Sequence, residues 1–153
     1  MHNLQKRHIY LPVIFGVLTP SLVIFVLEVF VGNMSPTRSV ADILYRQFAA
    51  GHNLFLIMAF GFIPFAILIG ATALFSLKLK GKQLDCVFIG GLVGILAFMI
   101  PTHVSVWYPL YSGRHMGSTA VVAFIFIPFL CIGTMGIGLL IGRVISLLAD
   151  EGR

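Results

Sequence analysis

The chain has 153 residues, of which 59% are hydrophobic and only 10% are charged, and its mean hydropathy is +1.04. Soluble domains carry about 25% charged residues, so this composition excludes a soluble globular protein. The formal net charge of +5 comes from basic residues scattered over several short segments, which argues against a nucleic-acid-binding face. We expect an all-α integral membrane protein.

Four apolar runs are long enough to cross a bilayer, which takes roughly 20 helical residues. The first run follows a basic start, but it is longer than the roughly 7 to 15 residues of a signal-peptide core. We therefore interpret it as a retained span and the chain, residues 1–153, as a single four-span membrane domain. The expected spans are residues about 9–31, 54–77, 87–110 and 119–140.

The segment between the first and second spans has a helical pattern of its own. Ser39 and Asp42 match the S-x-x-D form of a helix start, and Arg46 lies four residues after Asp42, the spacing of a helical ion pair. We predict a short amphipathic helix on the outer surface, with an ordered loop as the alternative. Its apolar face would carry Val40, Leu44 and Phe48.

The second and fourth spans contain nearly the same heptapeptide, AFGFIPF at residues 59–65 and AFIFIPF at residues 123–129. Both spans cross the membrane in the same direction, so their equivalence would make each half a helical hairpin. The halves, residues 1–80 and 81–153, would then form a parallel internal repeat. Chance matching in Phe- and Ile-rich sequence is the alternative, because the first and third spans show no comparable identity.

Prolines and glycines in these spans predict kinks and close helix contacts. Pro64 and Pro128 each remove a backbone hydrogen bond and are expected to kink their helices. Two G-x-x-x-G pairs favour close packing of helix backbones, and we expect them to pack against another copy of the chain. The packing glycines are Gly90, Gly94, Gly138 and Gly142.

The distribution of Lys and Arg predicts the orientation of the chain. Seven of these residues lie at the two termini and in the loop after the second span, and three lie on the other side. The excess of basic residues marks the cytoplasmic side, so both termini are expected in the cytoplasm, with the protein in a bacterial inner membrane. Trp107, Tyr108 and Tyr111 lie where the third span would leave the outer face, as interfacial anchors do.

Several ionisable or polar residues fall near the outer ends of the spans. An ionisable group inside a membrane is costly unless it is paired or hydrated, which makes each one a candidate functional residue. We expect Glu28 and His103 to meet, directly or through Arg114, in an outer vestibule for a ligand or a proton. The structural alternative pairs Glu28 with Arg46 or Arg114 and bonds the histidines to loop backbone. The vestibule residues are Glu28, His52, Asn53, His103, Arg114 and His115.

The motifs of cofactor and catalytic sites are missing from the sequence. Imidazoles with a carboxylate suit zinc or copper, but no H-x-x-x-H or H-E-x-x-H spacing fixes a ligand geometry, so we expect no metal. His52 and His103 form the one pair suited to ligate a b-type haem, yet no cofactor is the leading expectation. With no G-x-S-x-G, no P-loop and no closely spaced acidic pair, we expect no enzyme.

Three functional classes fit these features. The leading interpretation is an oligomeric transport or channel-like component that uses the outer vestibule, because four helices alone rarely enclose a pore. The second is a non-catalytic accessory or immunity-type subunit that binds a larger membrane partner. The third is a haem- or metal-binding subunit of a membrane redox complex. The expected partners are the lipid bilayer and a homo-oligomer or larger membrane complex, without nucleic acid.

Overall fold

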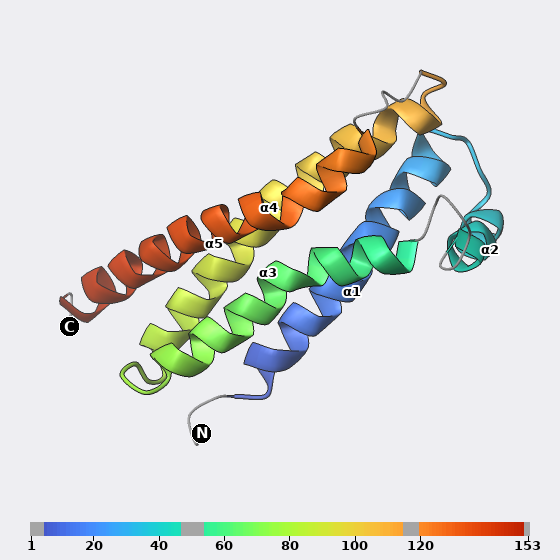
Figure 1. The fold of residues 1–153 in the computed structure, drawn as a ribbon. Helices are drawn as coiled ribbons and strands as arrows, with labels where there is room; N and C mark the ends of the chain where they lie inside the picture. Colours follow the sequence, from blue (N-terminus) through green and yellow to red (C-terminus); the bar gives the residue numbers. More distant parts are fainter. Residues whose placement is uncertain (1–4, 47–53, 115–119, 152–153) are drawn as a thin grey trace.

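The computed structural model of the protein describes residues 5–46, 54–114 and 120–151, and these ranges contain five helices (Figure 1). Four of the helices are long and apolar enough to cross a membrane. The prediction of an all-α chain with four potential membrane spans is therefore confirmed. The long helices are α1 (Arg7–Phe30), α3 (Leu54–Phe75), α4 (Lys82–Tyr111) and α5 (Ala120–Glu151), and the short one is α2 (Pro36–Arg46).

Two of the long helices extend beyond their predicted spans. Helix α4 begins at Lys82 rather than near residue 87, because Gly81 adopts a positive φ of 52°, a conformation that glycine tolerates without steric cost. Helix α5 continues to Glu151 instead of ending near residue 140. Arg143, a good helix former, lies within this extension and donates a hydrogen bond of 3.4 Å to Gln83 Oε1 of α4.

The long helices lie side by side as two neighbouring pairs, α1 with α3 and α4 with α5 (Figure 1). The most extensive contact is that between α4 and α5. Helix α2 lies beside the end of α1, and we call this end of the bundle the α2 end (Figure 1). The loop between α3 and α4 carries Lys78 and Lys80 at the other end, which we call the lysine-loop end.

The core consists of two main apolar clusters at different depths. The larger cluster joins α3, α4 and α5 and includes the fully buried Phe65, Ile95 and Met99. The second cluster lies toward the α2 end and includes Trp107 of α4 and Ile43 of α2. Ile43 therefore attaches α2 to the helix bundle through apolar contact.

The predicted packing glycines meet each other inside one chain. A Cβ atom on Gly90 would collide with the carbonyl oxygen of Gly138, and one on Gly142 would collide with the carbonyl oxygen of Cys86. Gly94 is equally close to the carbonyl oxygen of Thr134. The glycines thus hold α4 against α5 within the chain, and their packing against another copy stays a prediction.

Helix α2 is present, but it begins earlier than the sequence predicted. It begins at Pro36, where the missing N–H costs no helical hydrogen bond, and not at Ser39. The predicted pair between Asp42 and Arg46 is confirmed at 2.7 Å. Ser39 and Ile43 are the buried residues of α2, whereas the predicted apolar face is exposed at Val40 and Leu44 and its third member, Phe48, lies outside the described residues.

The two copies of the repeated heptapeptide lie in different surroundings. Pro64 of α3 and Pro128 of α5 are both buried within their helices. Phe65 is fully buried in the core, but its counterpart Phe129 is 62% exposed. The kinks and the internal duplication stay predictions.

Candidate functional site

Glu28 lies at the α2 end, near the end of α1, and its side chain is fully buried. Its two carboxylate oxygens have separate partners. The Ser39 hydroxyl of α2 donates to Oε2 at 2.6 Å, and the Tyr111 hydroxyl of α4 donates to Oε1 at 3.1 Å. One carboxylate therefore joins three helices, and the two hydrogen bonds offset part of the cost of its burial.

Arg46, the last residue of α2, supplies the positive charge of this cluster. Its Nη1 lies 3.5 Å from Glu28 Oε1 and donates a hydrogen bond of 2.8 Å to the Tyr111 hydroxyl. Its Nη2 pairs with Asp42 one turn earlier in α2. We call Glu28, Ser39, Arg46 and Tyr111 the Glu28 clamp, because together they fasten α2 to α1 and α4.

The clamp agrees with the structural alternative, in which Glu28 pairs with Arg46 or Arg114. The prediction that Glu28 meets His103 is wrong. The ion pair of Glu28 is with Arg46, whereas Arg114 is exposed just beyond the end of α4. His103 takes no part in the clamp, and the predicted bridge through Arg114 is not seen. The other predicted vestibule residues, His52, Asn53 and His115, lie outside the described residues.

His103 itself points into the bundle and is only 2% exposed. Neither of its ring nitrogens has a hydrogen-bond partner among the described residues. Its ring lies against Phe124 of α5, with 5.7 Å between the ring centroids. The prediction that His103 faces inward rather than toward lipid is confirmed. The alternative, a hydrogen bond from His103 to loop backbone, is not seen among the described residues.

Trp107, one turn further along α4, is a second buried polar ring without a hydrogen-bond partner among the described residues. It is 4% exposed, and its indole N–H has no acceptor among the described residues. Its ring also contacts Phe124, with 5.3 Å between the centroids. The prediction that Trp107 is an interfacial anchor is wrong, since the side chain turns inward, while its neighbour Tyr108 is exposed.

These residues form a line on the inner face of α4. His103, Trp107 and Tyr111 are spaced four apart, so they lie along one face of the helix with a rise of about 6 Å between neighbours. Tyr111 belongs to the Glu28 clamp, and the two unpartnered rings follow it into the bundle. Along the same face, the next positions are Met99 and Ile95, which are apolar and fully buried. The polar line therefore enters from the α2 end and stops at the larger apolar cluster.

A second polar cluster at the lysine-loop end was missed by the sequence analysis. His8 of α1 is 1% exposed, and its Nε2 lies 2.9 Å from Asp85 Oδ1 of α4. Its Nδ1 accepts the Gln5 backbone N–H at 3.2 Å, which assigns the ring proton to Nε2. Arg7 pairs with the other Asp85 oxygen. The signal was available, since His8 and Asp85 are ionisable residues expected at the same membrane face.

The described residues contain no group of three or more His, Cys, Asp or Glu side chains that could hold a metal ion. Cys86 and Cys131 are free cysteines. Comparisons of the chain with protein-family models, curated proteins and solved structures found no match. We therefore infer function from the geometry of the chain itself.

Proposed function

We propose that the protein is a small transport-type membrane component that binds a small hydrogen-bonding solute at His103 and Trp107. The observation that carries this proposal is the pair of buried polar rings that have no hydrogen-bond partner among the described residues. A buried donor left without a partner costs about 1 to 3 kcal/mol. A solute that satisfied both rings would recover that free energy on binding.

The chemistry of the two rings defines the solute. The Trp107 indole is a donor only, and a neutral imidazole offers one donor and one acceptor. The bound molecule must therefore present an acceptor to Trp107 and at least one polar group to His103. Phe124 lies beside both rings, so the rest of the molecule meets an apolar wall. A small neutral solute with a carbonyl or hydroxyl group fits these requirements.

The Glu28 clamp is placed to control access to this pair. Ile43 of α2 belongs to the same apolar cluster as Trp107, and the clamp fastens α2 through Ser39 and Arg46. Release of the clamp would free α2 and the Tyr111 end of the polar line. We propose that α2 covers the solute site and that its release opens it.

The same geometry argues for binding rather than for a permanent channel through one chain. Met99 and Ile95 are fully buried below His103, so an apolar barrier separates the site from the lysine-loop end. Passage of a solute would require rearrangement of the helices or association with further chains. The packing glycines contact each other within the chain, so they give no separate support to the oligomeric form of the channel hypothesis.

The placement of the site in the membrane is part of the proposal. The excess of Lys and Arg at the termini and lysine loop supports a cytoplasmic lysine-loop end, which places the α2 end outside. An amphipathic role for α2 at the outer surface and an arrangement of the two helix pairs as tandem hairpins fit this orientation. Under this proposal, solute enters from the outer side.

The haem-binding alternative uses the same histidine. His103 is buried with both ring nitrogens free of described partners, as an axial ligand would be before haem binds. Its predicted partner His52 lies outside the described residues. A Soret band in the purified protein would favour this alternative over solute binding.

The experiment that tests the proposed function uses the single tryptophan of the chain, which is Trp107. The purified protein in nanodiscs is titrated with acetamide, ethanol, acetate, methylammonium and urea while Trp107 fluorescence is recorded. We expect a saturable change with a neutral solute, and its loss in His103→Leu. The absence of a saturable response to every solute, or a response unchanged in His103→Leu, would contradict the proposal.

A further inference from the structure

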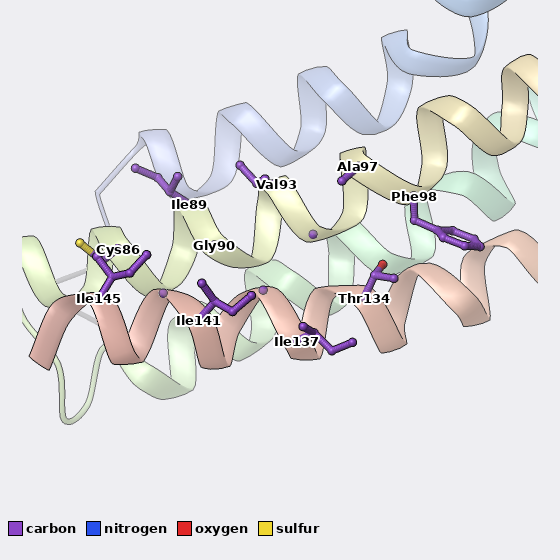
Figure 2. Close-up of a pocket in the computed structure, with 13 residues that line it drawn as sticks. Cys86, Ile89, Gly90, Val93, Ala97, Phe98, Thr134, Ile137, Ile141 and Ile145 are labelled. Carbon is purple, nitrogen blue, oxygen red and sulfur yellow. The ribbon is translucent and has the colours of Figure 1, made fainter. Parts of the chain in front are cut away.

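The outward face of the α4–α5 pair carries an apolar groove that plays no part in the proposed solute site. The groove has a volume of about 590 Å³ and is lined by residues from Cys86 to Phe98 of α4 and from Thr134 to Ile145 of α5. Figure 2 shows these residues along the two neighbouring helices. Thr134 supplies the main polar side chain of an otherwise apolar lining.

The glycine contact explains why the groove exists. Its floor contains Gly90, Gly94, Gly138 and Gly142, at which an added Cβ would strike the backbone of the facing helix. Side chains therefore cannot fill the floor without separating the helices. The walls stand at four-residue intervals on each helix, so they form continuous ridges. These walls are Ile89, Val93 and Ala97 on α4 and Ile137, Ile141 and Ile145 on α5.

The length of the groove indicates what occupies it. From Cys86 to Phe98 the α4 backbone rises roughly 18 Å, whereas the hydrocarbon core of a bilayer is about 30 Å thick. The groove therefore begins near the lysine-loop end and stops about halfway along α4. A partner helix that crossed the membrane would be expected to follow the whole length of the pair. One acyl chain of a lipid reaches only through its own leaflet, which matches the groove.

The charge at the open end indicates the kind of lipid. Lys82 is exposed and lies one turn before Cys86 on the same face of α4. Lys78 and Lys80 are also exposed in the adjoining loop. A basic residue next to the membrane surface attracts anionic headgroups.

We propose that the groove between α4 and α5 binds one acyl chain of an anionic phospholipid, with the lipid phosphate paired to Lys82. This binding differs from ordinary contact with bulk lipid, because the backbone-lined floor and the two ridges of the groove would enclose the acyl chain on three sides. The proposal concerns the lysine-loop half of the bundle and does not depend on solute binding at His103 and Trp107.

Native mass spectrometry tests this proposal on the full chain. The detergent-solubilised protein is titrated with dioleoyl phosphatidylglycerol or dioleoyl phosphatidylcholine, and bound lipids are counted. We expect one tightly held phosphatidylglycerol and weaker binding of phosphatidylcholine. Lys82→Ala should weaken phosphatidylglycerol binding by about fivefold, whereas Lys78→Ala, which removes the same charge outside the groove, should have a smaller effect.

A substitution that fills the groove distinguishes binding of the acyl chain in the groove from purely electrostatic binding of the headgroup. Val93→Phe places a larger side chain on a wall of the groove and should reduce binding of both lipids. The control is Leu140→Phe, which places phenylalanine at an exposed position outside the groove lining. Equal binding of both lipids, or no effect of Val93→Phe, would overturn the proposal. A photo-crosslinking residue at Ile141 in native membranes should attach lipid. Attachment to a protein, either a partner or a second copy, would also overturn it.

Discussion

The Ser39 hydroxyl donates a hydrogen bond of 2.6 Å to Oε2 of the fully buried Glu28. The two residues belong to different helices, so this bond fixes the position of α2 against the end of α1. Ser39 was predicted to lie at a helix start, yet its side chain is used to satisfy a buried carboxylate. This bond holds α2 beside α1, where Ile43 of α2 belongs to the same apolar cluster as Trp107.

Removal of the Ser39 hydroxyl should destabilise the protein. Ser39→Ala leaves one oxygen of Glu28 without its donor, and we expect a loss of about 1 to 3 kcal/mol in the free energy of unfolding. The loss is measured by unfolding in mixed micelles with increasing dodecyl sulfate. The control is Thr37→Ala, which removes an exposed hydroxyl from the same helix. Equal stability of the two variants would show that the hydrogen bond contributes nothing.

Two glycines of α5 should respond oppositely to the same substitution. Gly138→Ala places a methyl group against the carbonyl oxygen of Gly90, and overpacking of this kind costs about 1 to 3 kcal/mol. Gly136 has no neighbour within 4 Å of an added Cβ, so Gly136→Ala should be neutral or slightly stabilising through helix propensity. The measurement is unfolding in mixed micelles. A stable Gly138→Ala variant that loses only self-association would contradict packing of these glycines within the chain.

The pairing of His8 with Asp85 should depend on the acceptor oxygen more than on the negative charge. Asp85→Asn retains an oxygen that can accept from His8 Nε2, whereas Asp85→Ala leaves the buried ring donor unpartnered, at a cost of about 1 to 3 kcal/mol. Arg7 is half-exposed, so its ion pair adds little. We therefore expect Asp85→Ala to be the less stable variant by thermal unfolding. If both variants lost the same stability, the ion pair with Arg7 would be the dominant interaction.

Cysteine labelling tests the proposed orientation. In a variant without Cys86 and Cys131, a membrane-impermeant maleimide added outside should label Thr37→Cys and Arg114→Cys but not Lys80→Cys. All three positions are exposed, whereas Ser39 is buried and would be a poor probe. Labelling of Lys80→Cys alone would place the α2 end in the cytoplasm.

The sequence predicted the long helices better than the direction in which their side chains point. Four apolar runs were sufficient to identify four long helices, and the Asp42–Arg46 spacing predicted a pair that the structure contains. Trp107 and Tyr108 were both placed at the interface, but one turns into the core and the other outward. Lipid and protein core are equally apolar, so hydrophobic periodicity gives little information about which face of a membrane helix is buried.

The glycines illustrate a second limit of the sequence. A G-x-x-x-G pair shows that a helix backbone can be approached closely, but it does not identify the helix that approaches. The Glu28 clamp was predicted only in part. Arg46 was a candidate partner of Glu28, but Ser39 and Tyr111 were not, since their roles depend on how α2 packs against α1 and α4.

The central claim is that Trp107 lies in a buried site that the Glu28 clamp keeps closed, and acrylamide quenching of Trp107 fluorescence tests it most directly. The native protein in nanodiscs should show blue-shifted emission and weak quenching, because the indole is buried and its N–H has no partner among the described residues. Ser39→Ala should increase quenching, while Thr37→Ala should leave it unchanged. Strong quenching in the native protein, or identical quenching in all three proteins, would contradict the account.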